Sequence, residues 1–151
     1  MQPIASKLAK FRALSWPEQK VLLTAMLLLP LFWAGLRVLG LSRFQAWLDR
    51  SPLSAQTPLT FDEMTAIGTL VNIAANHAPG PATCLTRSLL LIWLLRRRGV
   101  SSELRIGVQL AQGKLDAHAW VEYAGKPIND AQDVAERFAA FNQPLSPESF
   151  L

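Results

Sequence analysis

The reactive chemistry of this sequence centres on one cysteine. Cys84 is the only cysteine, it closely follows the rigid turn Pro79-Gly80-Pro81, and it begins a strongly apolar segment with helical character. The free N–H groups and the dipole at a helix N-terminus stabilise a thiolate and can also hold an oxyanion. Cys84 is therefore a candidate nucleophile, and the alternative is a small buried core residue.

A cysteine nucleophile needs a base, and His118 is the candidate. It lies in a predicted strand in which Asp116, His118 and Trp120 share one face. The third residue, which orients the imidazole, is then Asp116 on the same strand or Asp130 on the next one. A cross-strand neighbour lies closer than a residue two positions along one strand, so we expect Asp130. Asn129 is the fallback, because an amide oxygen also accepts a hydrogen bond.

Three further residues are candidates for substrate binding: Arg87, Trp120 and Asn129. Arg87 follows Cys84 by one helical turn, and its alternative role is an ion pair with an acid at the edge of the core. For Trp120 the alternative is a place in the core. We expect His77 to be a surface or capping residue. The sequence has no CxxC or HxxxH pair, so no metal site is predicted.

The first 50 residues contain no strand pattern and are predicted to be helical. Ser15-Trp16-Pro17-Glu18 forms a capping box that begins a helix, and Pro30 is expected to kink or break that helix near Leu29. Residues 21–36 carry no formal charge. At about 1.5 Å per residue they cover only about 24 Å, too short to span a bilayer. We expect a buried helix or helical hairpin, with a docking surface for lipid or a partner as the alternative.

The rest of the chain is predicted to contain two more helices and a small sheet. After a Pro-rich linker, Thr60 caps a helix that ends near Asn76, and a central helix runs from Cys84 to Arg98. Beyond Gly99 the apolar period changes to two, which predicts an antiparallel meander packed on the central helix. The predicted elements are strands at 104–110 and 115–123, a short stretch at 127–130, and a short helix at 131–140.

The fold class is therefore α+β, one compact domain with a helical region at 1–50 and a catalytic core at 51–151. The net charge of +4 divides into +5 for residues 1–50 and −1 for the remainder. Because the basic residues lie among Leu and Trp at helical spacing, we expect solvated helix faces and no nucleic-acid binding. A single cysteine favours the cytoplasm.

The motifs from Cys84 to Asp130 resemble a known family. They are Cys84-Leu85-Thr86-Arg87-Ser88-Leu89, Leu94-Leu95-Arg96-Arg97-Arg98-Gly99, Arg105-Ile106-Gly107-Val108, Ala117-His118-Ala119-Trp120-Val121-Glu122 and Gly125-Lys126-Pro127-Ile128-Asn129. Together they are similar to the lasso peptide B proteins, transglutaminase-like cysteine peptidases that remove the leader from a lasso peptide precursor. The resemblance implies a papain-like or transglutaminase-like core and a Cys-His-Asp triad at Cys84, His118 and Asp130.

The resemblance also implies partners. Some family members carry a fused leader-recognition domain with strands, whereas the first 60 residues here lack a strand signal, so the chain resembles the split form. It would then act on a precursor peptide with a separate leader-recognition protein, beside a macrolactam synthetase that closes the ring. No cofactor is implied. The alternative functions are a transglutaminase-like acyltransferase and a non-catalytic docking module.

Overall fold

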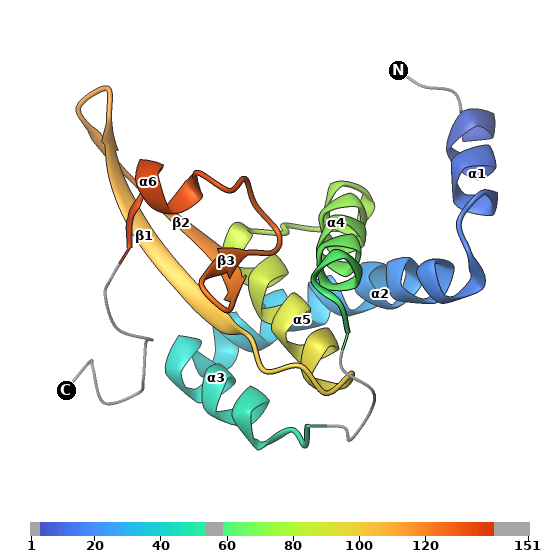
Figure 1. Cartoon of the computed structure of the whole chain (residues 1–151), viewed down its shortest axis with the longest axis horizontal. Helices are drawn as coiled ribbons and strands as arrows, with labels where there is room; N and C mark the ends of the chain where they lie inside the picture. The colour runs from blue at the N-terminus through green and yellow to red at the C-terminus, as the bar shows by residue number, and fades with distance from the viewer. Residues whose placement is uncertain (1–3, 54–58, 141–151) are drawn as a thin grey trace.

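The computed structural model describes residues 4–53 and 59–140. Its elements follow the order of the chain, with five helices before the sheet (Figure 1). The helices are α1 (Ile4–Arg12), α2 (Trp16–Leu39), α3 (Leu41–Arg50), α4 (Phe61–His77) and α5 (Cys84–Arg96). The α+β class is confirmed.

The two capping boxes predicted from sequence are present. At the start of α2 the Glu18 backbone N–H donates to the Ser15 hydroxyl, and the Ser15 N–H donates to the Glu18 carboxylate. Thr60 and Glu63 make the same reciprocal pair at the start of α4. Each box satisfies two backbone donors that a helix leaves without partners, which fixes where the helix begins.

Of the kink or break expected at Pro30, the break is wrong, because α2 continues through this residue. Proline removes one backbone hydrogen bond and crowds the preceding turn. On either side of it Leu29 and Phe32 are 1% and 4% exposed, and their burial offsets that cost. The helix is therefore 24 residues long and extends beyond both ends of the uncharged run at 21–36. Among the described residues it is the one helix with the length and composition to cross a membrane.

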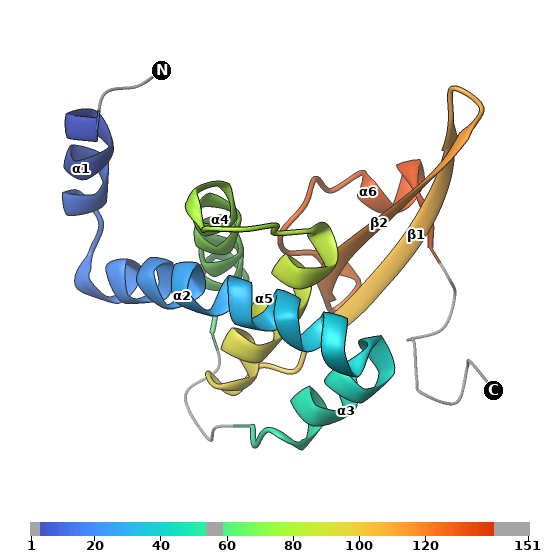
Figure 2. The same cartoon turned by 180° about the vertical axis from the view of Figure 1, so that it is seen from behind.

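Only one face of α2 fits the prediction of a buried helix. Five of its residues lie in the core: Val21, Leu22, Ala25, Leu29 and Phe32. They pack against α4 and α5. The opposite face carries exposed leucines. For this reason only 28% of the most apolar 18-residue stretch of α2 is buried. Seen from behind, α2 crosses the molecule in front of α5 (Figure 2).

Helix α5 is the centre of the fold. It lies between α2 and the sheet, and its run from Leu89 to Leu95 is almost entirely buried (Figure 1). Arg96 at its C-terminus donates to the carbonyl oxygens of Asp49 and Ser51, which ties α3 to α5. The helix ends two residues earlier than predicted, and Gly99 follows with a positive φ of 81°.

The sheet is antiparallel and has four strands in the order β3-β2-β1-β4. Strands β1 (Glu103–Ala111) and β2 (Lys114–Tyr123) form the predicted hairpin, with His118 opposite Gly107. The predicted third stretch reduces to β3 (Lys126–Pro127), so Asp130 lies in the loop beyond it. The expected helix at 131–140 is only α6 (Val134–Arg137), followed by β4 (Ala139–Ala140) against β1.

One hydrophobic cluster joins the helical half to the sheet. Its buried members run from Val21 in α2 to Ile128 after β3, and include residues of α3, α4, α5, β1 and β2. The proposed boundary at residue 50 stays a prediction, since this core crosses it. The tail at 141–151 lies outside the described residues.

Candidate active site

Cys84 is the first residue of α5, as predicted. Thr83 caps the helix, since its hydroxyl accepts from the Thr86 N–H at 3.2 Å and contacts the Thr86 hydroxyl at 2.9 Å. The first helical hydrogen bond runs from the Arg87 N–H to the Thr83 carbonyl. The backbone N–H of Cys84 is therefore at the positive end of the helix dipole, beside its own partly buried thiol.

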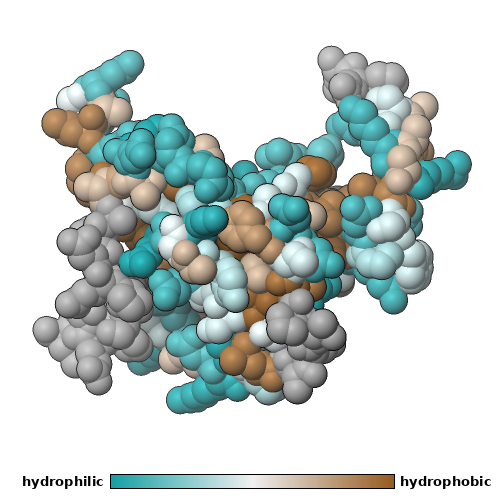
Figure 3. Space-filling view, in the orientation of Figure 1, coloured by the Kyte–Doolittle hydropathy of each residue, from teal (hydrophilic) through white to brown (hydrophobic). Residues whose placement is uncertain are grey.

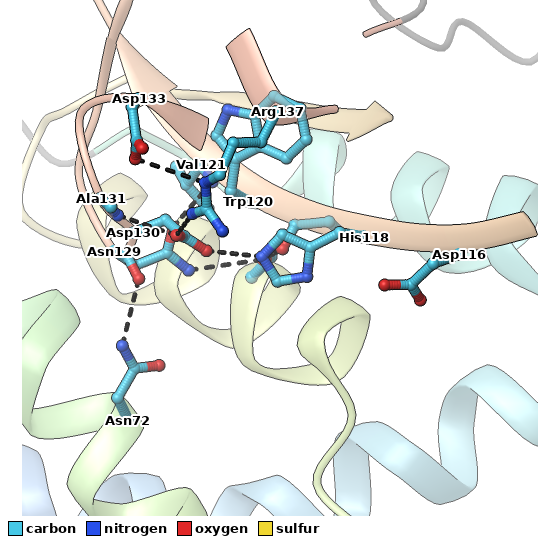
Figure 4. Close-up of polar contacts among 12 residues, drawn as sticks. Asn72, Asp116, His118, Trp120, Val121, Asn129, Asp130, Ala131, Asp133 and Arg137 are labelled. Carbon is cyan, nitrogen blue, oxygen red and sulfur yellow. Dashed lines mark hydrogen bonds and ion pairs between the residues drawn. The ribbon is translucent and has the colours of Figure 1, made fainter. Parts of the chain in front are cut away.

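His118 contacts Asp130, the acid chosen from the sequence. Its Nε2 lies 2.5 Å from Oδ2 of Asp130 (Figure 4). Asp130 reaches the ring from the loop after β3 and not from a paired strand, so the partner was predicted correctly but the strand geometry was not. Because Nε2 is occupied, Nδ1 is the ring nitrogen left to exchange a proton with a nucleophile.

Asp116, the rival acid, lies elsewhere. It is on β2 two residues before His118, and its carboxylate accepts from the side chain of Gln109 at 3.3 Å in an exposed position. In Figure 4 it sits apart from the His118–Asp130 pair, farther along the strand. Successive residues of one face are about 7 Å apart along a strand, which explains why it does not replace Asp130.

The second oxygen of Asp130 is also held in place. Its Oδ1 accepts from the Ala131 backbone N–H at 2.8 Å and lies 3.6 Å from the guanidinium of Arg137. Arg137 in turn pairs with Asp133, the N-cap residue of α6. These contacts fix the carboxylate while its other oxygen faces the imidazole (Figure 4).

Asn129 has a positioning role that sequence reasoning missed. Its side-chain oxygen accepts from the Val121 N–H at 2.9 Å, and its side-chain nitrogen donates to the buried hydroxyl of Ser88. Ser88 donates to the carbonyl of Ala119. Asn129 thus connects the loop to β2 and α5, while the next residue, Asp130, turns toward His118. The fallback role for Asn129 as the acid's substitute is wrong in this geometry.

Helix α4 supports the same loop from the other side. Asn72 donates its side-chain N–H to the carbonyl of Asn129 at 3.1 Å. One turn earlier, a Cβ added to Gly68 would lie 3.3 Å from the carbonyl of Ile128 and 3.3 Å from Cβ of Asn129. The loop therefore rests directly on the backbone of α4. The sequence carried no distinct signal for Asn72, which shares a helix face with Thr65, Thr69 and Asn76.

A small pocket joins the candidate residues. It has a volume of about 100 Å³, and its walls are Asn72, Cys84, Arg87, His118, Ala119, Asn129 and Asp130. Arg87 donates from Nε to the carbonyl of Ala82, and no ion pair with an acid is found for it in the described part of the chain. A larger apolar hollow of about 440 Å³ between α1, α2 and α4 holds no cysteine.

Two aromatic rings hold the imidazole of His118. Trp120 stacks beside it with centroids 6.1 Å apart, and Phe138 lies at 5.0 Å. Gly107 makes room for both, because a Cβ there would come within 2.9 Å of each. Trp120 is completely buried and donates to Glu122, so it has no surface to offer a substrate, and the predicted substrate-binding role is corrected to packing.

The remaining candidate, His77, is a surface residue, as expected. His77 is exposed in the last turn of α4, where its ring nitrogen contacts the carbonyl of Ile73. Within residues 4–53 and 59–140, no group of three His, Cys, Asp or Glu side chains is placed to hold a metal ion.

Comparison with known proteins gives one match. The family model described as the transglutaminase-like superfamily matches residues 25–143, which begins within α2 and covers every residue of the pocket. A search of curated proteins and a search of solved structures each found no match.

Proposed function

Because the chain belongs to the transglutaminase-like superfamily, we propose that it is a cysteine peptidase in which Cys84, His118 and Asp130 form the catalytic triad. The observation that carries the proposal is the His118–Asp130 hydrogen bond in a pocket shared with Cys84 at a helix N-terminus. A nucleophile, a base and an acid that orients the base are the three parts that such catalysis requires.

The proposed reaction proceeds through a thioester. The proton of the Cys84 thiol passes to Nδ1 of His118, and the sulfur attacks the carbonyl carbon of the scissile amide. The tetrahedral oxyanion forms beside the Cys84 N–H, whose position at the start of α5 favours negative charge. His118 returns the proton to the nitrogen of the leaving amine as the C–N bond breaks. Water then adds to the thioester, and Cys84 regains its proton.

Asp130 acts through His118 in this scheme. Its carboxylate holds the ring orientation and stabilises the imidazolium that forms when the thiol loses its proton. Both side chains are partly exposed, 27% for His118 and 21% for Asp130. Water therefore has access to the site, which favours hydrolysis over transfer to another amine.

We further propose that the substrate is the precursor of a lasso peptide and that the leader is the acyl part released. The motifs between residues 84 and 130 support this finer assignment through their resemblance to the lasso peptide B proteins. Arg87 lines the pocket and is a candidate to bind substrate carbonyls, with Asn129 at the pocket wall. The proposed partners are a separate leader-recognition protein and a macrolactam synthetase, in the cytoplasm.

The test is reconstitution of leader release. The chain is incubated with its precursor and the separate recognition protein, and the products are identified by mass spectrometry with and without an added primary amine. We expect free leader acid and free core peptide, and no product from Cys84→Ala or His118→Ala. An amide between the leader and the added amine would instead identify an acyltransferase.

Thiol labelling separates an enzyme from a docking module. We expect iodoacetamide near neutral pH to alkylate Cys84 quickly in the wild type and slowly in His118→Ala, because the imidazole takes the thiol proton. Equal and slow rates in both proteins would make Cys84 an ordinary core residue and refute the proposed triad.

A further inference from the structure

The outer face of α2 is an uninterrupted apolar surface. It is formed by Leu23, Leu27, Leu31, Ala34 and Val38, which recur every three or four residues and are called the α2 stripe below. The three leucines are 54%, 72% and 61% exposed. Single exposed leucines are common, but an aligned row of this length marks an interaction surface.

The α2 stripe can bind another surface only when the axis of α2 lies parallel to that surface. The opposite face of α2 holds Val21, Leu22, Ala25, Leu29 and Phe32 inside the core. A helix that crossed a bilayer would have to leave that core, although α2 is long enough to do so. Whatever covers the α2 stripe must therefore meet it sideways, along the back of the molecule where α2 runs (Figure 2).

Basic residues stand at both ends of the α2 stripe. Lys20 lies 5.3 Å from the ring centre of Trp16, and the Arg37 guanidinium lies 5.6 Å from that of Trp33. No formal charge separates Lys20 from Arg37 in the sequence, and residues 1–50 carry a net charge of +5. Aliphatic residues between Trp and Lys or Arg are the composition that fits an anionic lipid interface.

We propose that the α2 stripe binds the protein peripherally to an anionic lipid bilayer, with α2 in the plane of the headgroups. The leucines would enter the boundary between headgroups and acyl chains, and Lys20 and Arg37 would contact lipid phosphates. The proposal does not depend on the peptidase reaction. No residue of α2 lines the pocket of Cys84, so the bound protein keeps that pocket open.

Charge is the reason to choose lipid over a second copy of the chain. In an antiparallel pair of α2 helices, Lys20 of one copy would meet Arg37 of the other, and in a parallel pair each would meet its own kind. Like charges at both ends oppose either arrangement, whereas anionic headgroups complement them. The face seen in Figure 3 mixes hydrophilic and hydrophobic residues.

The test is sedimentation of the full chain with vesicles. One set contains phosphatidylcholine alone, and the other contains equal parts of phosphatidylcholine and phosphatidylglycerol. We expect binding to the anionic set that weakens with added salt. Leu23→Ser/Leu27→Ser/Leu31→Ser should weaken it by more than about tenfold, and Lys20→Glu/Arg37→Glu by at least about fivefold per residue.

Matched controls come from the β1–β2 hairpin. Leu110 and Leu115 are as exposed as the stripe leucines, so Leu110→Ser/Leu115→Ser should leave binding unchanged, as should Lys114→Glu. Circular dichroism and the alkylation rate of Cys84 report whether each variant is folded. Three outcomes overturn the proposal: no wild-type binding to anionic vesicles, equal loss in the hairpin controls, or a wild-type dimer that the leucine variant makes monomeric while lipid binding is absent.

Discussion

Replacing Gly68 with alanine tests whether α4 positions Asp130, the carboxylate of the proposed triad. Gly68 faces the loop at Ile128 and Asn129, and the added Cβ would stand 3.3 Å from both the Ile128 carbonyl and the Asn129 Cβ. Ordinary contacts of a Cβ begin at 3.4 Å, so the loop must move by a few tenths of an ångström. It cannot yield freely, because Asn72, Val121 and Ser88 all hold Asn129 by hydrogen bonds.

Two effects on stability oppose each other in this variant. Alanine is better than glycine in a helix by about 0.8–1.0 kcal/mol. Overpacking costs about 1–3 kcal/mol. We expect a net loss of about 0–2 kcal/mol, or up to about 8 °C in melting temperature at about 2–4 °C per kcal/mol.

We expect the rate of leader release to be more sensitive to this shift of the loop than the free energy of unfolding. A displacement of about 1 Å in a catalytic group costs on the order of a hundredfold, so a shift of a few tenths of an ångström predicts a loss of up to about tenfold. The assays are the rate of leader release and the alkylation rate of Cys84 by iodoacetamide. Both should fall in Gly68→Ala, because Asp130 moves with Asn129 and no longer orients His118 correctly.

The matched control is Thr69→Ala, at the neighbouring exposed position of α4. Thr69 is exposed, and its hydroxyl donates to the Thr65 carbonyl one turn earlier in the same helix. We expect unchanged release and alkylation in this variant. If Gly68→Ala were as active as Thr69→Ala and more stable than the wild type, the contact between α4 and the loop would not position Asp130, and the reasoning would be refuted.

Three further predictions follow from the same structure. Asp130→Ala should slow leader release by about 10²–10⁴-fold, whereas Asp116→Ala should stay close to the wild type; the reverse order would remove Asp130 from the triad. Thr83→Ala and Thr60→Ala should each lower the free energy of unfolding by about 1 kcal/mol in urea titrations. Only Thr83→Ala, which removes the cap beside Cys84, should also slow the alkylation of Cys84. Equal alkylation rates in the two variants would contradict a role for the start of α5. The backbone N–H and then the hydroxyl of Ser15 lower the pKa of Glu18. The stabilisation by the Glu18 carboxylate is therefore present above the ordinary glutamate pKa and is lost as the pH falls through the lowered value. The difference in melting temperature between wild type and Glu18→Gln should disappear in acid, and a difference that stays constant with pH would exclude the carboxylate charge as its cause.

Local signals predicted most of the elements. The capping boxes at Ser15 and Thr60, the turn before Cys84 and the change of period after Gly99 are short-range features, and each element begins or ends close to the residue they indicate. The error at Pro30 has the opposite origin. A proline inside a helix is judged locally as a break. The burial of Leu29 and Phe32 depends on the other helices packed against α2, which a local pattern does not contain.

The same distinction applies to the site. Cys84 and His118 were recognisable because each belongs to a strong local pattern, and Asp130 was chosen correctly as the partner of His118 although it lies in a loop. The support for that loop was not predictable, because Asn72 and Ser88 come from two helices and meet Asn129 only through tertiary packing. Trp120 was misassigned because alternation along β2 gives the face of a residue but not what covers it, which is Phe138.

The contact between the rings of Phe138 and His118 sets the order in which the site forms during synthesis. During synthesis from the N-terminus, Cys84 is made first, then His118, then Asp130, and Phe138 after all three. A nascent chain that ends before Phe138 would contain the three residues of the proposed triad without the ring that packs against His118. In the proposed triad, the site is therefore completed only when nearly all of the described chain has been synthesised.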